Sequence, residues 1–216
     1  MMNLNEDNIA HKIESEFGVT VKVSISSEAI GIDRLTSKER ERFGELGSER
    51  RLSWLKGRSA LKRLLNAVGE DEETSNITFP SARFSLTHSG DLAVAIGTES
   101  ATLLGIGVDL EVRRQVRSET ARFFLTESER TWLMSFEQSR RSKCLLRLWT
   151  IKEALFKSDP RNLERWFSDY ALQTPAEPRG RALVRGEAVL EFRYSSFEVE
   201  EGVLSVAALP RRPNDA

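Results

Sequence analysis

The chain has 216 residues, of which 39% are hydrophobic and 30% charged, and its 32 Lys and Arg against 33 Asp and Glu give a formal net charge of −1. This composition excludes intrinsic disorder, collagen and a coiled coil, and the length suits one large domain or two small packed halves. The single cysteine, Cys144, cannot form an internal disulfide, and the N-terminal segment lacks the apolar stretch of a secretory signal. Apolar stretches such as Leu92–Ile96 and Val203–Leu209 are far shorter than the ~20 residues of a membrane span. We therefore expect a cytoplasmic protein with no membrane partner.

The first elements are a strand and two helices. Apolar and polar residues alternate over Val19–Ile25, which predicts a strand. The sequence Thr36–Glu39 is a Thr-x-x-Glu capping box and predicts a helix through Phe43, and apolar residues at helical spacing predict a second helix over Glu49–Val68. The stretch Lys38–Arg63 holds nine basic residues against four glutamates. It is a solvated helical face, an anion site or a nucleic-acid surface, and the pattern does not decide among them.

Two further strands enclose a loop that holds a histidine. The strands are expected over Phe84–Leu86 and Leu92–Ile96, joined by the loop Thr87–Asp91. His88 lies among hydroxyl residues in this loop, and such a group of donors suits a phosphate. A histidine that stabilises the turn explains the pattern equally well. Zinc is not expected, because no second His or Cys is close in the sequence.

The second half also alternates strands and helices. The predicted elements are a strand over Leu103–Glu111, a helix opened by a second Thr-x-x-Glu box at Thr126–Glu129, a long helix over Ser139–Lys157, strands over Val184–Tyr194 and Val203–Leu209, and a frayed tail over Pro210–Ala216. The long helix is expected to stop at Asp159-Pro160, because proline cannot continue a helix.

A weak internal repeat connects the two halves. Leu35–Arg40 resembles Leu125–Arg130, Trp54…Lys62 resembles Trp149…Lys157 with Arg58 over Glu153, and Gly90–Ala95 resembles Gly202–Ala207, at offsets of 90, 95 and 112 residues. The three matches keep their order and their offsets grow, as insertions would cause. We therefore predict an α+β fold made as a pseudo-dimer of two similar α+β halves, residues 1–100 and 101–216, with a ligand site at their junction.

The sharpest local signal is the pair of carboxylates in Gly105–Glu111. Side chains alternate along a strand, so Asp109 and Glu111 project from one face. Neighbouring carboxylates repel unless a cation, a proton or basic groups lie between them, and oxygen ligands of this kind suit Mg²⁺. A strand end with solvated acids is the alternative, and the two explanations remain open at this point.

A second signal lies in the long helix. Glu153 and Lys157 are neighbours at spacing i,i+4, and Trp149 lies one turn earlier on the same stripe. Such a Glu–Lys pair is commonly a surface ion pair worth about 0.2–0.5 kcal/mol, and Trp149 and Phe156 are commonly core residues. On its own, the helix does not identify a site.

Together these segments resemble the 4'-phosphopantetheinyl transferase family, of the surfactin-synthetase-activating type. The motifs that carry the resemblance stand in the family's order: Trp54-Leu-Lys-Gly-Arg58, Ser85-Leu-Thr-His-Ser-Gly90, Gly107-Val-Asp-Leu-Glu111, Arg122-Phe-Phe-Leu-Thr-Glu127 and Trp149-Thr-Ile-Lys-Glu-Ala-Leu-Phe-Lys157. The resemblance spans about Leu35 to Lys157, and the family's fold is a pseudo-dimer of α+β halves.

The resemblance implies transfer of 4'-phosphopantetheine from coenzyme A to a serine of an acyl or peptidyl carrier protein, with release of adenosine 3',5'-bisphosphate. It implies that Asp109, Glu111 and Glu153 hold Mg²⁺, and that Lys157 contacts the coenzyme A pyrophosphate and stabilises the departing phosphate. The resemblance also assigns coenzyme-binding roles to three other residues: Thr87 on the pyrophosphate, and His88 and Arg58 on the 3'-phosphate. Glu153 is our candidate for the base that accepts the serine proton. A duplicated chain of this kind is expected to act as a monomer.

Two departures and two alternatives accompany this reading. The stretch Asn76–Arg83 lacks the lysine loop of many relatives, and Ser158–Leu163 replaces a Gly-x-Gly-Leu segment. The lost loop motivates the first alternative, an inactive module that binds coenzyme A or a carrier protein. The second is another Mg²⁺-dependent phosphotransferase or nuclease, although a net charge of −1 gives no reason to expect a nucleic-acid partner.

Overall fold

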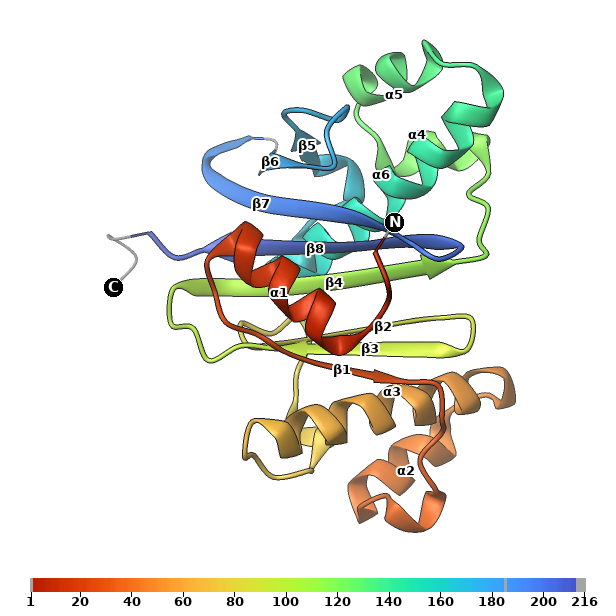
Figure 1. Cartoon of the computed structure of the whole chain (residues 1–216), viewed down its shortest axis with the longest axis vertical. Coiled ribbons are helices and arrows are strands. Elements are labelled where there is room, and N and C mark those ends of the chain that lie inside the picture. Colours follow the sequence, from red (N-terminus) through yellow and green to blue (C-terminus); the bar gives the residue numbers. More distant parts are fainter. Residues whose placement is uncertain (1, 185, 213–216) are drawn as a thin grey trace.

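The structure is a computed structural model, and it describes residues 2–184 and 186–212. Its strands form two antiparallel sheets, a three-stranded sheet in the order β1-β3-β2 and a five-stranded sheet in the order β4-β8-β7-β6-β5 (Figure 1). The first half contains α1 (Glu6–Phe17), β1 (Lys22–Ser26), α2 (Ser37–Glu45), α3 (Ser48–Ala67), β2 (Phe84–Ser89) and β3 (Leu92–Gly97). The second half contains β4 (Leu103–Val112), α4 (Ala121–Phe124), α5 (Glu127–Met134), α6 (Gln138–Ser158), β5 (Tyr170–Leu172), β6 (Arg179–Val184), β7 (Glu187–Val199) and β8 (Gly202–Pro210).

Most of the predicted elements are confirmed. Both capping boxes are formed, with reciprocal hydrogen bonds between Thr36 and Glu39 at the start of α2 and between Thr126 and Glu129 at the start of α5. The two long helices begin and end within two residues of their predicted limits. Within the described residues, no helix combines the length and the apolar character needed to cross a bilayer.

Three sequence expectations need correction. The loop expected over Thr87–Asp91 is shorter, because β2 continues through Ser89 and His88 therefore lies on a strand. The strand expected from Val184 begins at Glu187, since Val184 ends β6, and the short strands β5 and β6 were not predicted at all. Of the expected frayed tail, Pro210 instead ends strand β8, and residues 213–216 lie outside the described part of the chain.

The fold is an α+β pseudo-dimer, because the two halves share one order of elements. Apart from α4, β5 and β6 of the second half, each half has a strand followed by two helices and two strands, and the last strand pairs between the other two: β1-β3-β2 and β4-β8-β7. The strands β5 and β6 extend only the second sheet.

The buried positions correct the register predicted for the repeat. Lys62 forms a buried ion pair with Glu39, and Lys152 forms one with Glu129, so the helices match at an offset of 90 residues. The same offset superimposes the buried faces of α3 and α6: Leu55 on Leu145, Ala60 on Thr150, Leu61 on Ile151, Leu64 on Ala154 and Leu65 on Leu155. The counterpart of Lys62 is therefore Lys152 rather than Lys157, and the counterpart of Glu153 is Arg63.

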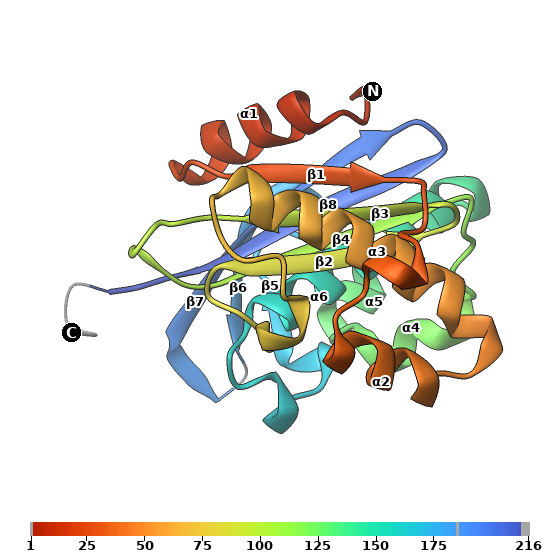
Figure 2. The same cartoon turned by 90° about the horizontal axis from the view of Figure 1, so that it is seen from below.

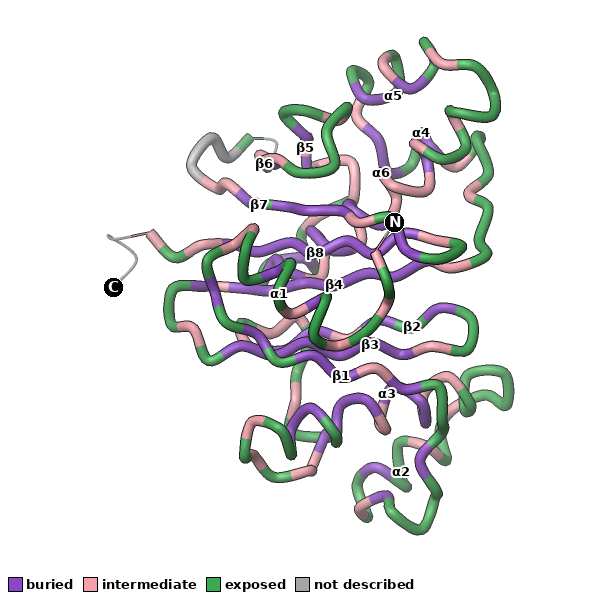
Figure 3. The backbone as a smooth tube through the Cα atoms, viewed as in Figure 1, coloured by how far each residue is buried: buried purple, intermediate pink, exposed green. Residues whose placement is uncertain are grey.

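A shared apolar core joins the two halves. Ile9 and Ile13 of α1 belong to one buried apolar cluster with Val94 from the first sheet and with Val108 and Val206 from the second. The strands are mostly buried, whereas the loops and the outer helical faces are exposed (Figure 3). Because one helix covers strands of both sheets, the halves form a continuous core.

A row of hydroxyl groups joins the facing edges of the two sheets. β2 and β4 are edge strands, and an edge strand leaves alternate backbone N–H groups unpaired. The N–H groups of Val108, Leu110 and Val112 donate hydrogen bonds to the hydroxyls of Ser85, Thr87 and Ser89, at 3.0, 3.2 and 3.0 Å respectively. Side chains at alternate positions of β2 therefore replace the backbone hydrogen bonds that would normally join two neighbouring strands. They bring the carboxylates of β4 next to β2, the strand that carries His88.

Candidate active site

A cavity of about 700 Å³ lies at the junction of the two halves. The first half contributes Arg58 from α3 and His88 from β2, and the second contributes Glu153 and Lys157 from α6. Its walls are partly apolar and are formed by Trp54, Phe79, Pro80, Leu86, Phe156 and Phe167. Four of the predicted site residues thus line one space, although they come from segments far apart in the sequence.

Close packing of α6 on β4 brings the helix residues to the strand carboxylates. A Cβ atom on Gly107 would collide with the backbone carbonyl of Ala154, and one on Gly105 with the carbonyl of Ser158. These glycines therefore allow the helix backbone to lie directly on the strand. The Gly-x-Gly-x-Asp pattern is explained by this packing, and one result is that Lys157 reaches Asp109.

The buried Asp109 carboxylate is held through one of its oxygens. Oδ1 accepts hydrogen bonds from the Thr87 hydroxyl at 3.0 Å and from Lys157 Nζ at 2.7 Å. Oδ2 is buried and has no hydrogen-bond partner. A buried oxygen of an acid normally has a partner, so this unpartnered oxygen fits a cation as its ligand.

Glu111, two residues further along the same face, is oriented by three donors. Oε2 accepts from the Ser89 hydroxyl at 3.1 Å, and Oε1 accepts from the Trp149 indole at 3.1 Å and from Arg114. The Arg114 guanidinium also lies over the Trp149 ring. Trp149 is therefore both a core residue and a positioning residue for Glu111.

Glu153 is a third acid close to this pair. Burial raises its pKa to about 7, Lys157 opposes the shift, and the charges of Asp109 and Glu111 add to it. The described residues nevertheless contain no cluster of three His, Cys, Asp or Glu side chains close enough to hold a metal as they stand. Since Mg²⁺ usually takes one or two protein carboxylates and completes its shell with water and phosphate oxygens, Asp109 and Glu111 fit it as donors.

His88 and Arg58 form the basic side of the cavity. His88 is exposed to solvent on one side, but partial burial and the charge of Lys157 lower its pKa, so the neutral ring offers one N–H donor at neutral pH. Arg58 donates to the Thr74 hydroxyl at 3.1 Å, lies over the Trp54 ring, and keeps its buried Nε without a partner. These groups can serve an anion.

Thr87 contacts Asp109 rather than the cavity, and the pyrophosphate role assigned to it by the resemblance stays a prediction. It is buried, does not line the cavity, and donates its only hydroxyl proton to Asp109. Its position in the structure makes it a positioning residue for Asp109. Arg114 was not predicted; its place three residues after Glu111 was the available signal.

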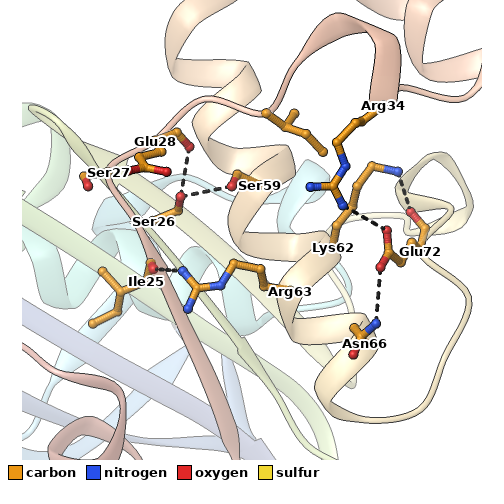
Figure 4. Close-up of a pocket in the computed structure, with 11 residues that line it drawn as sticks. Ile25, Ser26, Ser27, Glu28, Arg34, Ser59, Lys62, Arg63, Asn66 and Glu72 are labelled. Atoms are coloured by element: carbon orange, nitrogen blue, oxygen red, sulfur yellow. Dashed lines mark hydrogen bonds and ion pairs between the residues drawn. The ribbon is translucent and has the colours of Figure 1, made fainter.

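A larger cavity, of about 790 Å³, occurs within the first half and is drawn in Figure 4. It contains the counterparts of the acids: Ser26 stands for Asp109 in the strand register, and Arg63 stands for Glu153 at the offset of 90 residues. Arg63 donates to the Ile25 carbonyl at 2.7 Å and pairs with Glu6 of α1 at 3.1 Å. Because Asp109 and Glu153 have no acidic counterparts there, the junction cavity is the better candidate.

Comparison with known proteins agrees with these motifs. Residues 105–207 match the family described as the 4'-phosphopantetheinyl transferase superfamily. The match covers just under half of the chain. The match confirms the predicted family and class of enzyme, and its segment contains Asp109, Glu111, Glu153 and Lys157; the surfactin-synthetase-activating subtype stays a prediction.

Two solved structures similar to this chain are holo-(acyl-carrier-protein) synthases. The one from Bacillus anthracis str. Ames, in complex with CoA (3',5'-ADP), is 20% identical with a TM-score of 0.41, and the alignment covers 52% of this chain and 100% of that chain. The one from Thermotoga maritima is 20% identical with a TM-score of 0.40, covering 51% of this chain and 65% of that chain. Neither likeness is close enough to support a conclusion about activity. No curated protein matches the chain.

Proposed function

We propose that the protein transfers 4'-phosphopantetheine from coenzyme A to a serine of an acyl or peptidyl carrier protein and releases adenosine 3',5'-bisphosphate. The observation that carries the proposal is the junction cavity itself, in which Glu153 and Lys157 of one half face His88 and Arg58 of the other, beside the paired acids of β4. One chain supplies both sides of the cavity, which supports action as a monomer. A cytoplasmic location remains a prediction.

The residues of the cavity have different roles in the transfer, which follow from their charges. The phosphorus atom next to the pantetheine arm forms a bond to the serine oxygen, and its bond to the oxygen bridging the two phosphates breaks. That bridging oxygen and its electron pair leave with adenosine 3',5'-bisphosphate. Lys157 Nζ lies 2.7 Å from Asp109 and lines the cavity, so it can neutralise the leaving phosphate. The apolar walls exclude water from the reacting phosphate, and His88 and Arg58 hold the 3'-phosphate.

Glu153 is placed to accept the serine proton. Its pKa of about 7 lies close to the working pH, which is the condition for an efficient general base. Asp109 and Glu111 would hold Mg²⁺, with Glu153 as the third acid beside them. The ion would supply charge neutralisation on the pyrophosphate oxygens. Glu153 can act both as a ligand of the ion and as the base if it accepts the serine proton through one water molecule.

The test is mass spectrometry of an apo carrier protein incubated with coenzyme A, Mg²⁺ and the protein. We expect a phosphopantetheine adduct on serine, its loss with EDTA, and its return with excess Mg²⁺. Glu153→Gln and Asp109→Ala are each expected to abolish labelling without unfolding the protein. Glu119→Ala, which removes an exposed acid outside the cavity, is the matched control and should label normally. Labelling at the wild-type rate by either site variant would refute the assignment.

The inactive-binder alternative has a distinct outcome. The stretch 76–83 lacks the lysine loop of relatives, so a binder would retain affinity for coenzyme A and yet label no carrier protein. Calorimetry with coenzyme A, run beside the mass spectrometry, separates the two functions.

A further inference from the structure

Four of the large exposed apolar side chains lie in the segments that line the junction cavity. Among the described residues, those with large exposed apolar side chains are Ile32, Leu52, Phe79, Phe123, Met134, Leu163 and Trp166. Phe79 lines the cavity, Leu52 precedes the lining residue Ser53, Leu163 follows the lining residue Asn162, and Trp166 precedes the lining residue Phe167. Isolated apolar residues on a surface need no explanation, but a group around one opening does. We call Leu52, Phe79, Leu163 and Trp166 the rim cluster.

Leu163 and Trp166 are the most exposed members. They are 95% and 76% exposed, and they lie in the short segment that follows α6. This segment projects from the same side of the molecule as α2 (Figure 2). Two large apolar side chains so fully in water, three residues apart, are costly for a solvent-facing loop.

The segment that carries them is firmly held. The carboxylate of Asp159, which is fully buried, accepts hydrogen bonds from the Arg161 backbone N–H at 2.9 Å and from the Tyr170 hydroxyl at 3.0 Å. Asp169 accepts the backbone N–H of Trp166 at 2.7 Å. The apolar pair is therefore presented on a fixed backbone, which lowers the entropic cost of covering it.

The site's own chemistry indicates what covers this surface. Under the proposed function, on which this inference rests, the acceptor serine must approach Glu153 through the cavity mouth, so the acceptor's surface must lie against the rim. The proposed function places coenzyme A inside the cavity, whereas the side chains of Leu163 and Trp166 are exposed and do not line it. We propose that the rim cluster, and Leu163 and Trp166 above all, is the docking surface for an apolar patch around the acceptor serine of the carrier protein.

The proposal predicts that changes in the rim cluster affect the affinity for the carrier protein but not the affinity for the nucleotide. Leu163→Ser and Trp166→Ser remove apolar surface from the rim and leave the lining residues in place. We expect the double variant to bind an apo carrier protein at least about tenfold more weakly, as loss of an aromatic anchor commonly does. Its affinity for adenosine 3',5'-bisphosphate should stay within about twofold of wild type, because that ligand lies inside the cavity.

The experiment measures both dissociation constants by calorimetry and the KM for the carrier protein by mass spectrometry. Ile32→Ser is the matched control, since Ile32 is 50% exposed and neither it nor its sequence neighbours line the cavity. Unchanged carrier affinity in the double variant would overturn the proposal. An equal loss of affinity for the nucleotide would also overturn it, because the surface would then serve coenzyme binding. The same holds if the wild type is a dimer and the double variant is a monomer, because the surface would then serve self-association.

Failure of the proposed function looks different. A wild-type protein that binds the carrier without labelling it refutes the transfer, while the rim cluster is still judged by the binding data. A wild-type protein that binds no carrier protein refutes the docking surface directly.

Discussion

At the scale of single residues, position rather than residue type decides what each acid does. Asp109 is neutralised by Lys157, Glu111 is held by Trp149 and Arg114, and Glu153 keeps a pKa near neutrality. The first two are therefore suited to hold charge, and the third to exchange a proton. The sequence placed all three in the site because the family motif contains them, but their different roles follow from their different partners.

The raised pKa of Glu153 predicts a pH-dependent stability. Its folded pKa of about 7 exceeds the ordinary value of 4.5, so the folded state binds a proton that the unfolded state releases between these values. Glu153 thus destabilises the fold progressively from pH 4.5 to 7, and the cost stays constant above that. We expect Glu153→Gln to raise the free energy of unfolding by on the order of 2 kcal/mol at pH 8 and by almost nothing at pH 4. Urea unfolding in EDTA at both pH values measures this; an equal effect at both would contradict it.

At the scale of elements, each pair of helices is fastened by the same buried ion pair. Lys152 donates to Glu129 at 2.8 Å and to the Tyr170 carbonyl, while Lys62 donates to Glu39 at 2.9 Å and to the Glu72 carbonyl at 2.7 Å. In both halves the glutamate also belongs to the capping box. The lysine of the Trp-x-x-Lys-Glu motif is therefore structural: it fixes the helix that presents Glu153.

Loss of one partner of this pair should be severe. Lys152→Met leaves the Glu129 carboxylate buried without its cation, and we expect a loss of about 3–5 kcal/mol in the free energy of unfolding. Lys62→Met should cost a similar amount, because its geometry is equivalent. The double variant Lys152→Met with Glu129→Gln should recover part of the loss. Chemical denaturation measures all three, and a loss below about 1 kcal/mol for Lys152→Met would show that the pair is not needed.

At the scale of the whole molecule, the duplicated chain retains one set of acids at one junction. The first half has Ser26 and Arg63 where the second has Asp109 and Glu153, and α1 ties Arg63 through Glu6. The remaining junction depends on the hydroxyl row between β2 and β4, which also orients Asp109 and Glu111. The same hydrogen bonds thus join the two halves and form the site.

A pair of serine variants tests this junction. Ser85 and Ser24 are both buried, but the Ser85 hydroxyl accepts the Val108 N–H at 3.0 Å whereas the Ser24 hydroxyl has no partner. Ser85→Ala should cost about 1–3 kcal/mol, because it strands a buried N–H group. Ser24→Ala should be neutral or stabilising. Thermal and chemical unfolding of both variants supply the measurement, and equal effects would show that the row does not hold the halves together.

The sequence alone determined the local structure and identified the candidate site residues. Capping boxes, helical spacing and strand alternation depend on near neighbours, so they could be read from the chain, and so could the order of the family motifs. The hairpin length, the strands β5 and β6, and the register of the repeat could not, because pairing partners and buried faces decide them. Only the tertiary structure showed that Thr87 holds Asp109, that Trp149 holds Glu111 and that Lys152 is structural. Each of these roles depends on a contact between residues more than fifteen positions apart, and the chain's linear pattern carries no record of such contacts.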